Sequence, residues 1–290
     1  MRQNEAIQWI SPSGEAITIA AVGTPVHLDE VRGLDGLEQD IYTVKGSGQA
    51  GLSVAGATLM EREIEITVSI ARNHVPYRRA LLRAFRPAST PGTLVFRRGE
   101  ESWHISAYVE TAPVFELGVL ETGTITLLCP SPALLAGDAD ATGSVDIAEW
   151  IDDIEFDFEI PAEGHTLAHR APQLIVDVYN DGDLEAGTRI VFAANGAAKN
   201  PSLVNVQTQE KISLTITLQA GDLLEVNTAY GKKRVTLTRD GTQSNVFNLL
   251  DAGSRWMQMH PGDNFLRFAA DEGADNLDVR IYSSSAYSGV

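Results

Sequence analysis

Three glycines near residue 50 have the spacing of a dinucleotide-binding fingerprint. Gly46, Gly48 and Gly51 form GxGxxG within the stretch KGSGQAG. This fingerprint holds a pyrophosphate only where a buried strand enters it and a helix leaves it, because the helix N-terminus supplies free N–H groups. The segment that follows, residues 62–71, instead alternates apolar and polar side chains, which is typical of a half-buried strand. The sequence therefore predicts a glycine-rich turn between strands and no nucleotide cofactor.

The acidic stretch GDADATGSVDIAEW has the spacing of a calcium-binding loop. Side-chain oxygens fall at the ligand positions of such a loop, and Gly143 lies at the position where the sharp turn requires glycine. However, Pro130 and Pro132 leave little room for an entering helix, and a strand pattern begins near Phe156. We favour a flexible acidic linker, with a calcium site as the alternative. The ligands of that site would be Asp138, Asp140, Thr142, Ser144, Asp146 and Glu149.

No set of residues in the sequence has the pattern of a catalytic centre. His165 and His169 have the i, i+4 spacing of a metal pair, but they lie between prolines and no Glu or Cys completes a zinc site. There is no GxSxG elbow and no Walker loop. Cys129 is the single cysteine, which excludes an internal disulfide. Trp103 and Trp256 could line a sugar site, although aromatic residues in strands usually pack in the core. We predict a protein that is not an enzyme and has no catalytic residues.

Length and charge place further bounds on the function. A chain of 290 residues is long enough for about two domains. Its formal net charge of −17, with both halves acidic, opposes attraction to nucleic-acid phosphates and to anionic lipids. The N-terminus lacks the apolar run of a secretory signal, and no stretch is apolar enough to span a membrane. We expect a soluble protein made in a cytoplasm, with no specific nucleic-acid binding and no membrane insertion.

Short alternating strands separated by turn residues predict a mainly β protein. We expect an N-terminal β domain over residues 1–135, an acidic linker over 136–152, and a C-terminal antiparallel β-sandwich of about ten strands over 153–290. A strong strand signal in the last part is DIEFDFEIP, residues 153–161. The strands expected in the first part span residues 17–22, 39–45, 62–71, 93–98, 102–110 and 122–129.

One segment, PYRRALLRAFRP at residues 76–87, has a helical period instead. Tyr77, Leu81 and Phe85 recur at i, i+4 and i+8 as one apolar stripe, with a proline at each end of the segment. Another face of this short helix carries three arginines, which are either solvated or in contact with an acidic neighbour. We place these three at or near a subunit interface: Arg79, Arg83 and Arg86.

Several segments, taken in chain order, carry a resemblance to one protein family. They are GLDGLEQDIYTVKGSGQAG, LMEREIEITVSI, RRALLRAFRPASTPGTLVFRRG, ITLLCPSP, YNDGDLEAGTRIVF, NPSLVNVQTQEKISLTITLQAGDLLEVNTAYGKKRVTL and SNVFNLLDAGSRWMQMHPGDNFLRF. Through nearly its whole length the sequence resembles the distal tail (Dit) proteins of siphophages, the long-tailed phages with non-contractile tails. It departs from the family pattern at Ala133, where an aromatic residue often follows the proline pair, and in the acidic stretch 138–149.

The resemblance implies a structural role at the distal end of the phage tail, as part of the virion. It implies an N-terminal belt domain that closes into a homo-hexameric ring and a galectin-like C-terminal sandwich that projects outward. The implied partners are the tail tube protein, the tail-associated hub protein, and receptor-binding or baseplate proteins, with DNA passing through the lumen. The alternative function is a carbohydrate-binding sandwich, a tail accessory protein that contacts the host surface.

Two runs of opposite charge agree with a ring. Seven arginines and no acid lie between Arg72 and Arg98, whereas ten acids and no Lys or Arg lie between Asp138 and Glu163. A head-to-tail contact between identical subunits requires two different, complementary patches on each subunit. The two runs would supply such a pair.

Overall fold

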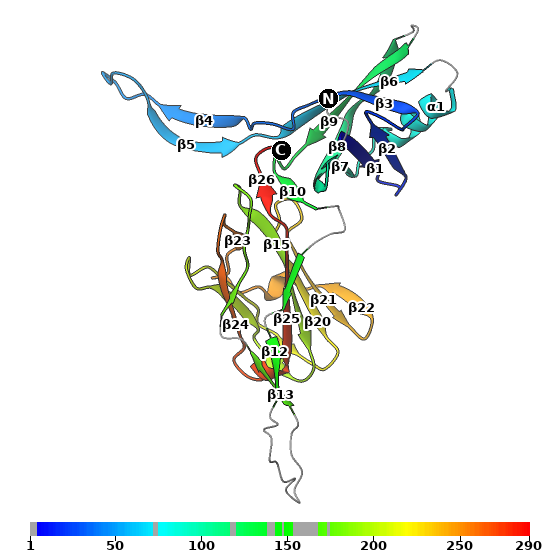
Figure 1. The fold of residues 1–290 in the computed structure, drawn as a ribbon. Helices are drawn as coiled ribbons and strands as arrows, with labels where there is room; N and C mark the ends of the chain where they lie inside the picture. Colours follow the sequence, from blue (N-terminus) through cyan, green and yellow to red (C-terminus); the bar gives the residue numbers. More distant parts are fainter. Residues whose placement is uncertain are drawn as a thin grey trace, which may run out of the picture. The chain divides into compact units, whose positions relative to one another are not determined.

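The computed structural model describes residues 5–71, 75–116, 120–137, 143–146, 148–152, 168–172 and 175–290. The chain divides into two compact units, drawn in Figure 1. Unit 1 contains residues 1–141 and 286–290, and unit 2 contains residues 142–285. The sequence interpretation did not anticipate that residues 286–290 return to the first unit. The strand expected at 153–161 lies outside the described residues.

Unit 1 is built around a sheet that closes into a barrel. Strand β8 (Glu101–Glu116) pairs with β7 (Gly92–Arg98) on one side and with β9 (Leu120–Cys129) on the other. These strands are connected through the order β7-β1-β2-β3-β6-β9, so the circuit of strands is complete (Figure 1). The remaining barrel strands are β1 (Glu5–Ile10), β2 (Ala16–Ala20), β3 (Val26–Arg32) and β6 (Arg62–Ala71).

The predicted helix is confirmed as α1 (Val75–Ala84), and its apolar stripe closes the barrel core. Leu81 and Phe85 are fully buried, while Tyr77 at the start of the stripe is partly exposed. The Trp9 indole N–H donates a hydrogen bond to the Ala84 carbonyl at 2.8 Å, and its ring stacks on Phe85 with centroids 5.2 Å apart. No helix in the described part of the chain is long and apolar enough to cross a membrane.

Two further features of unit 1 lie outside the barrel circuit. The hairpin formed by β4 (Gln39–Val44) and β5 (Ser53–Leu59) makes a separate two-stranded sheet, which Figure 1 shows as a long arm. The short strand β10 (Leu134–Ala136) pairs with β8 and with β26 (Ala286–Tyr287). Because β26 follows the last strand of unit 2, both ends of unit 2 are joined covalently to unit 1.

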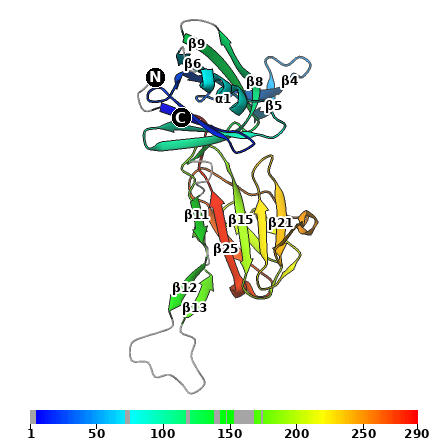
Figure 2. The ribbon, with the colours of Figure 1, turned by 90° about the vertical axis from the view of Figure 1, so that its right-hand side faces the viewer.

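Unit 2 is a sandwich of antiparallel sheets, and Figure 2 shows its larger sheet. The larger sheet has the order β11-β25-β15-β20-β21-β22, and the second has the order β14-β24-β17-β18. Its elements are β11 (Gly143–Asp146), β12 (Ala148–Asp152), β13 (Ala168–Pro172), β14 (Val176–Asp177), β15 (Ala186–Ala194), β16 (Ala198–Lys199), β17 (Ser202–Asn205), β18 (Lys211–Ser213), β19 (Thr217–Leu218), β20 (Leu223–Asn227), β21 (Arg234–Arg239), β22 (Thr242–Asn245), η1 (Phe247–Leu249), β23 (Gln258–Met259), β24 (Phe265–Ala269), η2 (Ala274–Asn276) and β25 (Leu277–Ser283).

Strand β15 shows how the sequence sorts residues between the two faces of the larger sheet. Its side chains alternate strictly between buried and partly exposed. Ile190 and Phe192 are fully buried in the core, whereas Arg189, Val191 and Ala193 lie on the outward face. This period of two is the pattern from which a sandwich strand was predicted. The mainly β fold expected from the sequence is confirmed.

Candidate interaction surfaces

The glycine fingerprint lies at the turn of the β4–β5 hairpin. Gly48 and Gly51 have φ values of +75° and +84°, which side chains with a Cβ rarely adopt. The Gln49 side-chain oxygen accepts a hydrogen bond from the Gly46 N–H at 2.9 Å and closes the loop. The predicted glycine-rich turn after the strand at 39–45 is therefore confirmed, whereas the strand that follows it, β5, was not predicted.

The strands of this hairpin expose apolar side chains to an unusual extent. Ile41 and Val44 on β4 are each 58% exposed, and Val54 on β5 is 67% exposed. Tyr42 and Leu59 are also more than two-fifths exposed. A two-stranded hairpin is only marginally stable by itself in water, and contiguous exposed apolar surface is typical of a protein–protein contact. The β4–β5 hairpin is thus the first candidate interaction surface.

The three arginines predicted at an interface lie on or just after α1, and the structure separates their roles. Arg83 forms an ion pair with Glu15 of the same chain, which raises the pKa of Arg83 by hydrogen bonding and by charge. Arg79 and Arg86 are exposed and form no ion pair with any residue that the structure describes. The structure therefore leaves two of these three positive charges open to a partner.

The residues predicted to bind calcium are described only in part. Asp138, Asp140 and Thr142 lie outside the described residues. The backbone at Ser144 and Asp146 is extended in β11, which pairs with β25. No group of three or more metal-binding side chains lies within the described part of the chain. Calcium binding therefore stays a prediction.

The last calcium candidate and one histidine of the predicted pair lie on one hairpin. Glu149 is on β12, which pairs with β13, and His169 is on β13. The backbone at the last calcium position is therefore extended, where a calcium loop of the EF-hand type continues into a helix. The second histidine of the pair, His165, lies outside the described residues.

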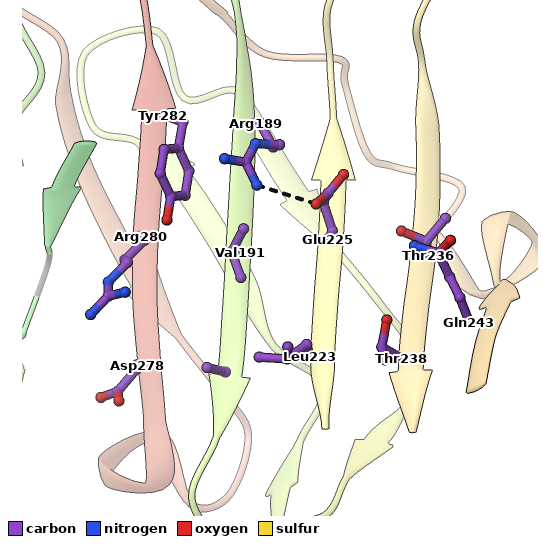
Figure 3. A pocket seen from close by; sticks show the side chains of 11 residues that line it. Arg189, Val191, Leu223, Glu225, Thr236, Thr238, Gln243, Asp278, Arg280 and Tyr282 are labelled. Carbon is purple, nitrogen blue, oxygen red and sulfur yellow. Dashed lines mark hydrogen bonds and ion pairs between the residues drawn. The ribbon is translucent and has the colours of Figure 1, made fainter. Parts of the chain in front are cut away.

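A hollow lies on the outward face of the larger sheet of unit 2 (Figure 3). It spans strands β25, β15, β20, β21 and β22 and has a volume of about 340 Å³. Its centre is formed by Val191 and Ala193, whose short side chains leave depth between longer neighbours on both sides. The hollow is therefore a consequence of residue size along one face of β15.

Charged groups along the rim of this hollow hold one another in place. The Arg189 guanidinium carbon lies 3.8 Å from the centroid of the Tyr282 ring, and its Nη1 lies 3.3 Å from the Glu225 carboxylate. The other oxygen of Glu225 accepts a hydrogen bond from Arg234 at 2.7 Å. An arginine fixed by an aromatic ring and a carboxylate loses little entropy when it binds a ligand.

The two tryptophans considered for a sugar site have different surroundings. Trp103 packs against the barrel core and stacks on Phe96 with ring centroids 6.1 Å apart, as expected for a core residue. Trp256 is half-buried and stacks on Phe247 at 5.7 Å. The Lys233 ammonium lies 5.6 Å from the Trp256 ring. The surroundings of Trp256 form a second, aromatic surface on unit 2.

The chain is similar to known proteins in sequence and in fold. Residues 181–283 match the family model described as the siphovirus-type tail component, C-terminal domain (SPP1_Dit). The chain is also similar to the solved structure of the Dit protein of phage SPP1, with a TM-score of 0.65 and 12% identity over 97% of this chain and 98% of that chain. That protein is described as a paradigm of the hub adsorption apparatus in phages that infect Gram-positive bacteria.

Two structures of the phage P2 baseplate in its activated conformation give similar results. The structure with Ca matches with a TM-score of 0.55 and 11% identity over 100% of both chains. The structure with Sr matches with a TM-score of 0.56 and 10% identity over 99% of both chains. No curated protein matches the chain. The resemblance to siphophage distal tail proteins is confirmed, by fold along the chain and by the family model in unit 2.

Proposed function

We propose that this protein is a structural component of a phage tail tip whose copies assemble head-to-tail into a closed ring of six. The observation that carries this proposal is the exposed apolar surface of the β4–β5 hairpin. A side chain such as Val54, 67% exposed on a strand, gains favourable free energy only when another surface covers it. The similarity in fold to hub proteins of phage tails supports a neighbouring copy as that surface.

Ring closure needs a second patch that differs from the first. The exposed face of α1 supplies one candidate, because Arg79 and Arg86 present positive charge on a strongly acidic protein. Opposite charges across an interface fix its register and accelerate association. We assign these two arginines to the contact with an acidic surface of the next subunit, whereas Arg83 is already paired with Glu15.

The same role defines the remaining partners. Above and below the ring we place the tail tube protein and the tail-associated hub protein, with receptor-binding or baseplate proteins attached outside. DNA would cross the lumen during ejection, and the net charge of −17 would repel its phosphates and prevent adhesion. A gel-shift assay at low salt with duplex DNA should show no complex with the assembled protein. Retention of the DNA would contradict a non-adhesive lumen.

The hairpin can be tested by replacing apolar β-branched side chains with threonine, which is β-branched and polar. The triple variant Ile41→Thr, Val44→Thr, Val54→Thr should remain folded but lose the ring, measured by size-exclusion chromatography with light scattering. The matched control is Val22→Thr with Val114→Thr, two valines that are 62% and 68% exposed elsewhere in unit 1. The control should assemble as the wild type does. Assembly of the triple variant at wild-type concentration would overturn this role of the hairpin.

The arginines need a design that separates contacts within one chain from contacts between chains. The double variant Arg79→Glu, Arg86→Glu should weaken assembly without lowering the melting temperature of the subunit. Arg83→Glu should break the ion pair with Glu15 within the chain and leave the contact between chains intact. Adding Glu15→Arg restores a pair of opposite charges, so the double variant should regain the melting temperature and assembly of the wild type. Unchanged assembly of the double variant would remove these two arginines from the interface.

A further inference from the structure

Three segments of unit 2 bring aromatic and basic side chains together at the surface. They are the turn between β20 and β21, the short helix η1, and the segment that precedes β23. The Lys233 ammonium lies 4.9 Å from the centroid of the Tyr230 ring and 5.6 Å from that of the Trp256 ring. The Trp256 ring stacks in turn on Phe247, with centroids 5.7 Å apart. These four side chains make up the aromatic surface.

A buried glutamine fixes the backbone that carries this surface. The Gln258 amide nitrogen donates hydrogen bonds to the carbonyls of Thr228 at 2.9 Å and Trp256 at 3.1 Å. Within the turn, the Lys232 N–H donates to the Ala229 carbonyl at 3.0 Å. The backbone of the aromatic surface is thus held in place before any partner binds, which lowers the entropy that binding costs.

The rings of the aromatic surface are open to solvent. Tyr230 is 66% exposed and Phe247 is 49% exposed, while Trp256 is half-buried. Aromatic residues are enriched in the cores of protein–protein interfaces and among the residues that contribute most of the binding free energy. This composition indicates a contact with another protein chain.

The charge of this surface is opposite to the charge of the protein. Three exposed basic side chains on its segments form no ion pair with any residue that the structure describes: Lys232, Lys233 and Arg255. Arg234, which follows them in the turn, is already paired with Glu225. Residues 228–233 and 245–256, which form the surface, contain one acid, Asp251. Positive charge at one place on a chain with a net charge of −17 favours a partner that brings carboxylates there.

The position of the Lys233 ammonium beside two rings defines both parts of such a partner. An ammonium group has three N–H donors, so a carboxylate of the partner can pair with it while the rings hold it in place. Apolar side chains next to that carboxylate would cover Tyr230 and Phe247 and exclude water from the ion pair, which strengthens it.

We propose that the aromatic surface binds a segment of another protein in which acidic residues alternate with apolar ones. Lys233 pairs with a carboxylate of that segment, and its apolar side chains cover Tyr230 and Phe247. Single-stranded nucleic acid fits less well, because it requires a basic groove that follows its backbone, whereas the protein as a whole is acidic. The proposal concerns unit 2 and does not depend on the ring.

The experiment measures binding of a fluorescein-labelled peptide to the full-length protein by fluorescence polarisation. The probe has the sequence DIEFDFEIP, which occurs at residues 153–161 of this chain and has the required alternation. We expect the wild type to bind this peptide, with an affinity that falls as salt is added. A peptide with lysine in place of every acid should bind at least tenfold more weakly. A peptide with serine in place of every Ile and Phe should be weakened to the same extent.

Variants of the protein test the surface itself. Lys233→Glu reverses the central charge and Tyr230→Ser removes an exposed ring, so each should lower the affinity at least tenfold without changing the melting temperature. The matched controls are Arg267→Glu, the same charge reversal on β24 of the other sheet, and Tyr179→Ser, which removes a tyrosine that is 61% exposed outside the three segments. Both controls should bind as the wild type does. Light scattering should give one particle mass for all variants, which separates a failure of this proposal from a failure of the ring.

Three results would overturn the complementarity on which the proposal rests. The first is the absence of binding by the wild type at millimolar peptide. The second is equal binding of the three peptides, since neither the carboxylates nor the apolar side chains would then select the ligand. The third is wild-type affinity of Lys233→Glu and Tyr230→Ser.

Two further results would assign the surface to a different occupant. Tighter binding of the probe by Phe156→Ser, Phe158→Ser than by the wild type would show that the chain's own segment occupies the surface. Displacement of the probe by a single-stranded DNA oligonucleotide or by a neutral oligosaccharide at equal concentration would assign the surface to that class of ligand. Either result contradicts a segment of another protein as the partner.

Discussion

The guanidinium of Arg62 donates a hydrogen bond to the backbone carbonyl of Ser288, 226 residues further along the chain. The same side chain donates to the carbonyls of Gly33 at 2.6 Å and Pro132 at 2.8 Å. Arg62 is only 4% exposed, and its burial lowers the pKa of its guanidinium. One buried cation thus joins three segments of unit 1, including the segment that returns after unit 2.

Replacement of Arg62 should therefore destabilise unit 1. In Arg62→Met three partly buried carbonyls lose their donor, and we expect a loss of about 3 kcal/mol in the free energy of unfolding. Arg62→Lys should also be costly, because one ammonium group cannot reproduce the planar fork that reaches three acceptors. Denaturant unfolding followed by fluorescence measures both values.

The control for this prediction is an exposed arginine of the same unit. Arg32 pairs with Glu30 at 2.9 Å at the surface, so Arg32→Met should change stability by less than about 0.5 kcal/mol. Equal effects of Arg62→Met and Arg32→Met would show that the hydrogen bonds to Gly33, Pro132 and Ser288 contribute little.

A pair of glycines separates backbone strain from steric overlap. Gly33 and Gly14 have similar φ values of +85° and +83°, so alanine at either position is strained by about 1 kcal/mol. A Cβ at Gly33 would lie 2.0 Å from the Glu63 carbonyl oxygen, whereas a Cβ at Gly14 would meet open space. We predict that Gly33→Ala lowers the melting temperature far more than Gly14→Ala does. Similar melting temperatures would refute the close approach.

Stability should fall at high pH because of Cys129. Burial raises the pKa of its thiol from 9.0 to about 12, opposed only by the nearby charge of Arg62. The unfolded chain therefore loses a proton that the folded chain retains between these two pH values, and stability declines there as pH rises. Between about pH 9 and pH 11 the expected loss from this group is roughly 2–3 kcal/mol.

The measurement compares wild type with Cys129→Ala in denaturant titrations across this pH range. The wild type should lose more stability with rising pH than the variant, since the variant has no thiol to ionise. The folded wild type should also resist thiol-specific reagents at neutral pH, because the side chain is fully buried. Parallel pH profiles of the two proteins would contradict a raised pKa at this position.

The elements predicted correctly from the sequence are those in which the spacing of apolar residues matches the burial seen in the structure. The alternation in residues 62–71 and the stripe of Leu81 and Phe85 correspond to β6 and α1. Strand β5 was not anticipated, since SVAGATL is poor in the large and β-branched residues that mark strands. Its partner β4 was predicted as a strand, but no local pattern shows that both sides of a hairpin stay exposed.

The sequence predicts a candidate site only to the extent that the alternation within one strand shows which side chains share a face. The sequence places Arg189, Val191 and Ala193 on one face of β15 by alternation alone. It cannot show that Glu225 and Thr236 lie in register with Val191, because pairing between strands depends on the whole sheet. Likewise, the arginine face of α1 is visible in the sequence, whereas the ion pair between Arg83 and Glu15 depends on tertiary folding.

The central claim, a ring of six subunits, is tested most directly by the mass and shape of the purified full-length protein. One chain has a mass of 31.3 kDa. Light scattering and negative-stain electron microscopy should show a particle of six times that mass with a central hole. A mass of one chain at every concentration tested, with no ring in the images, would contradict the account.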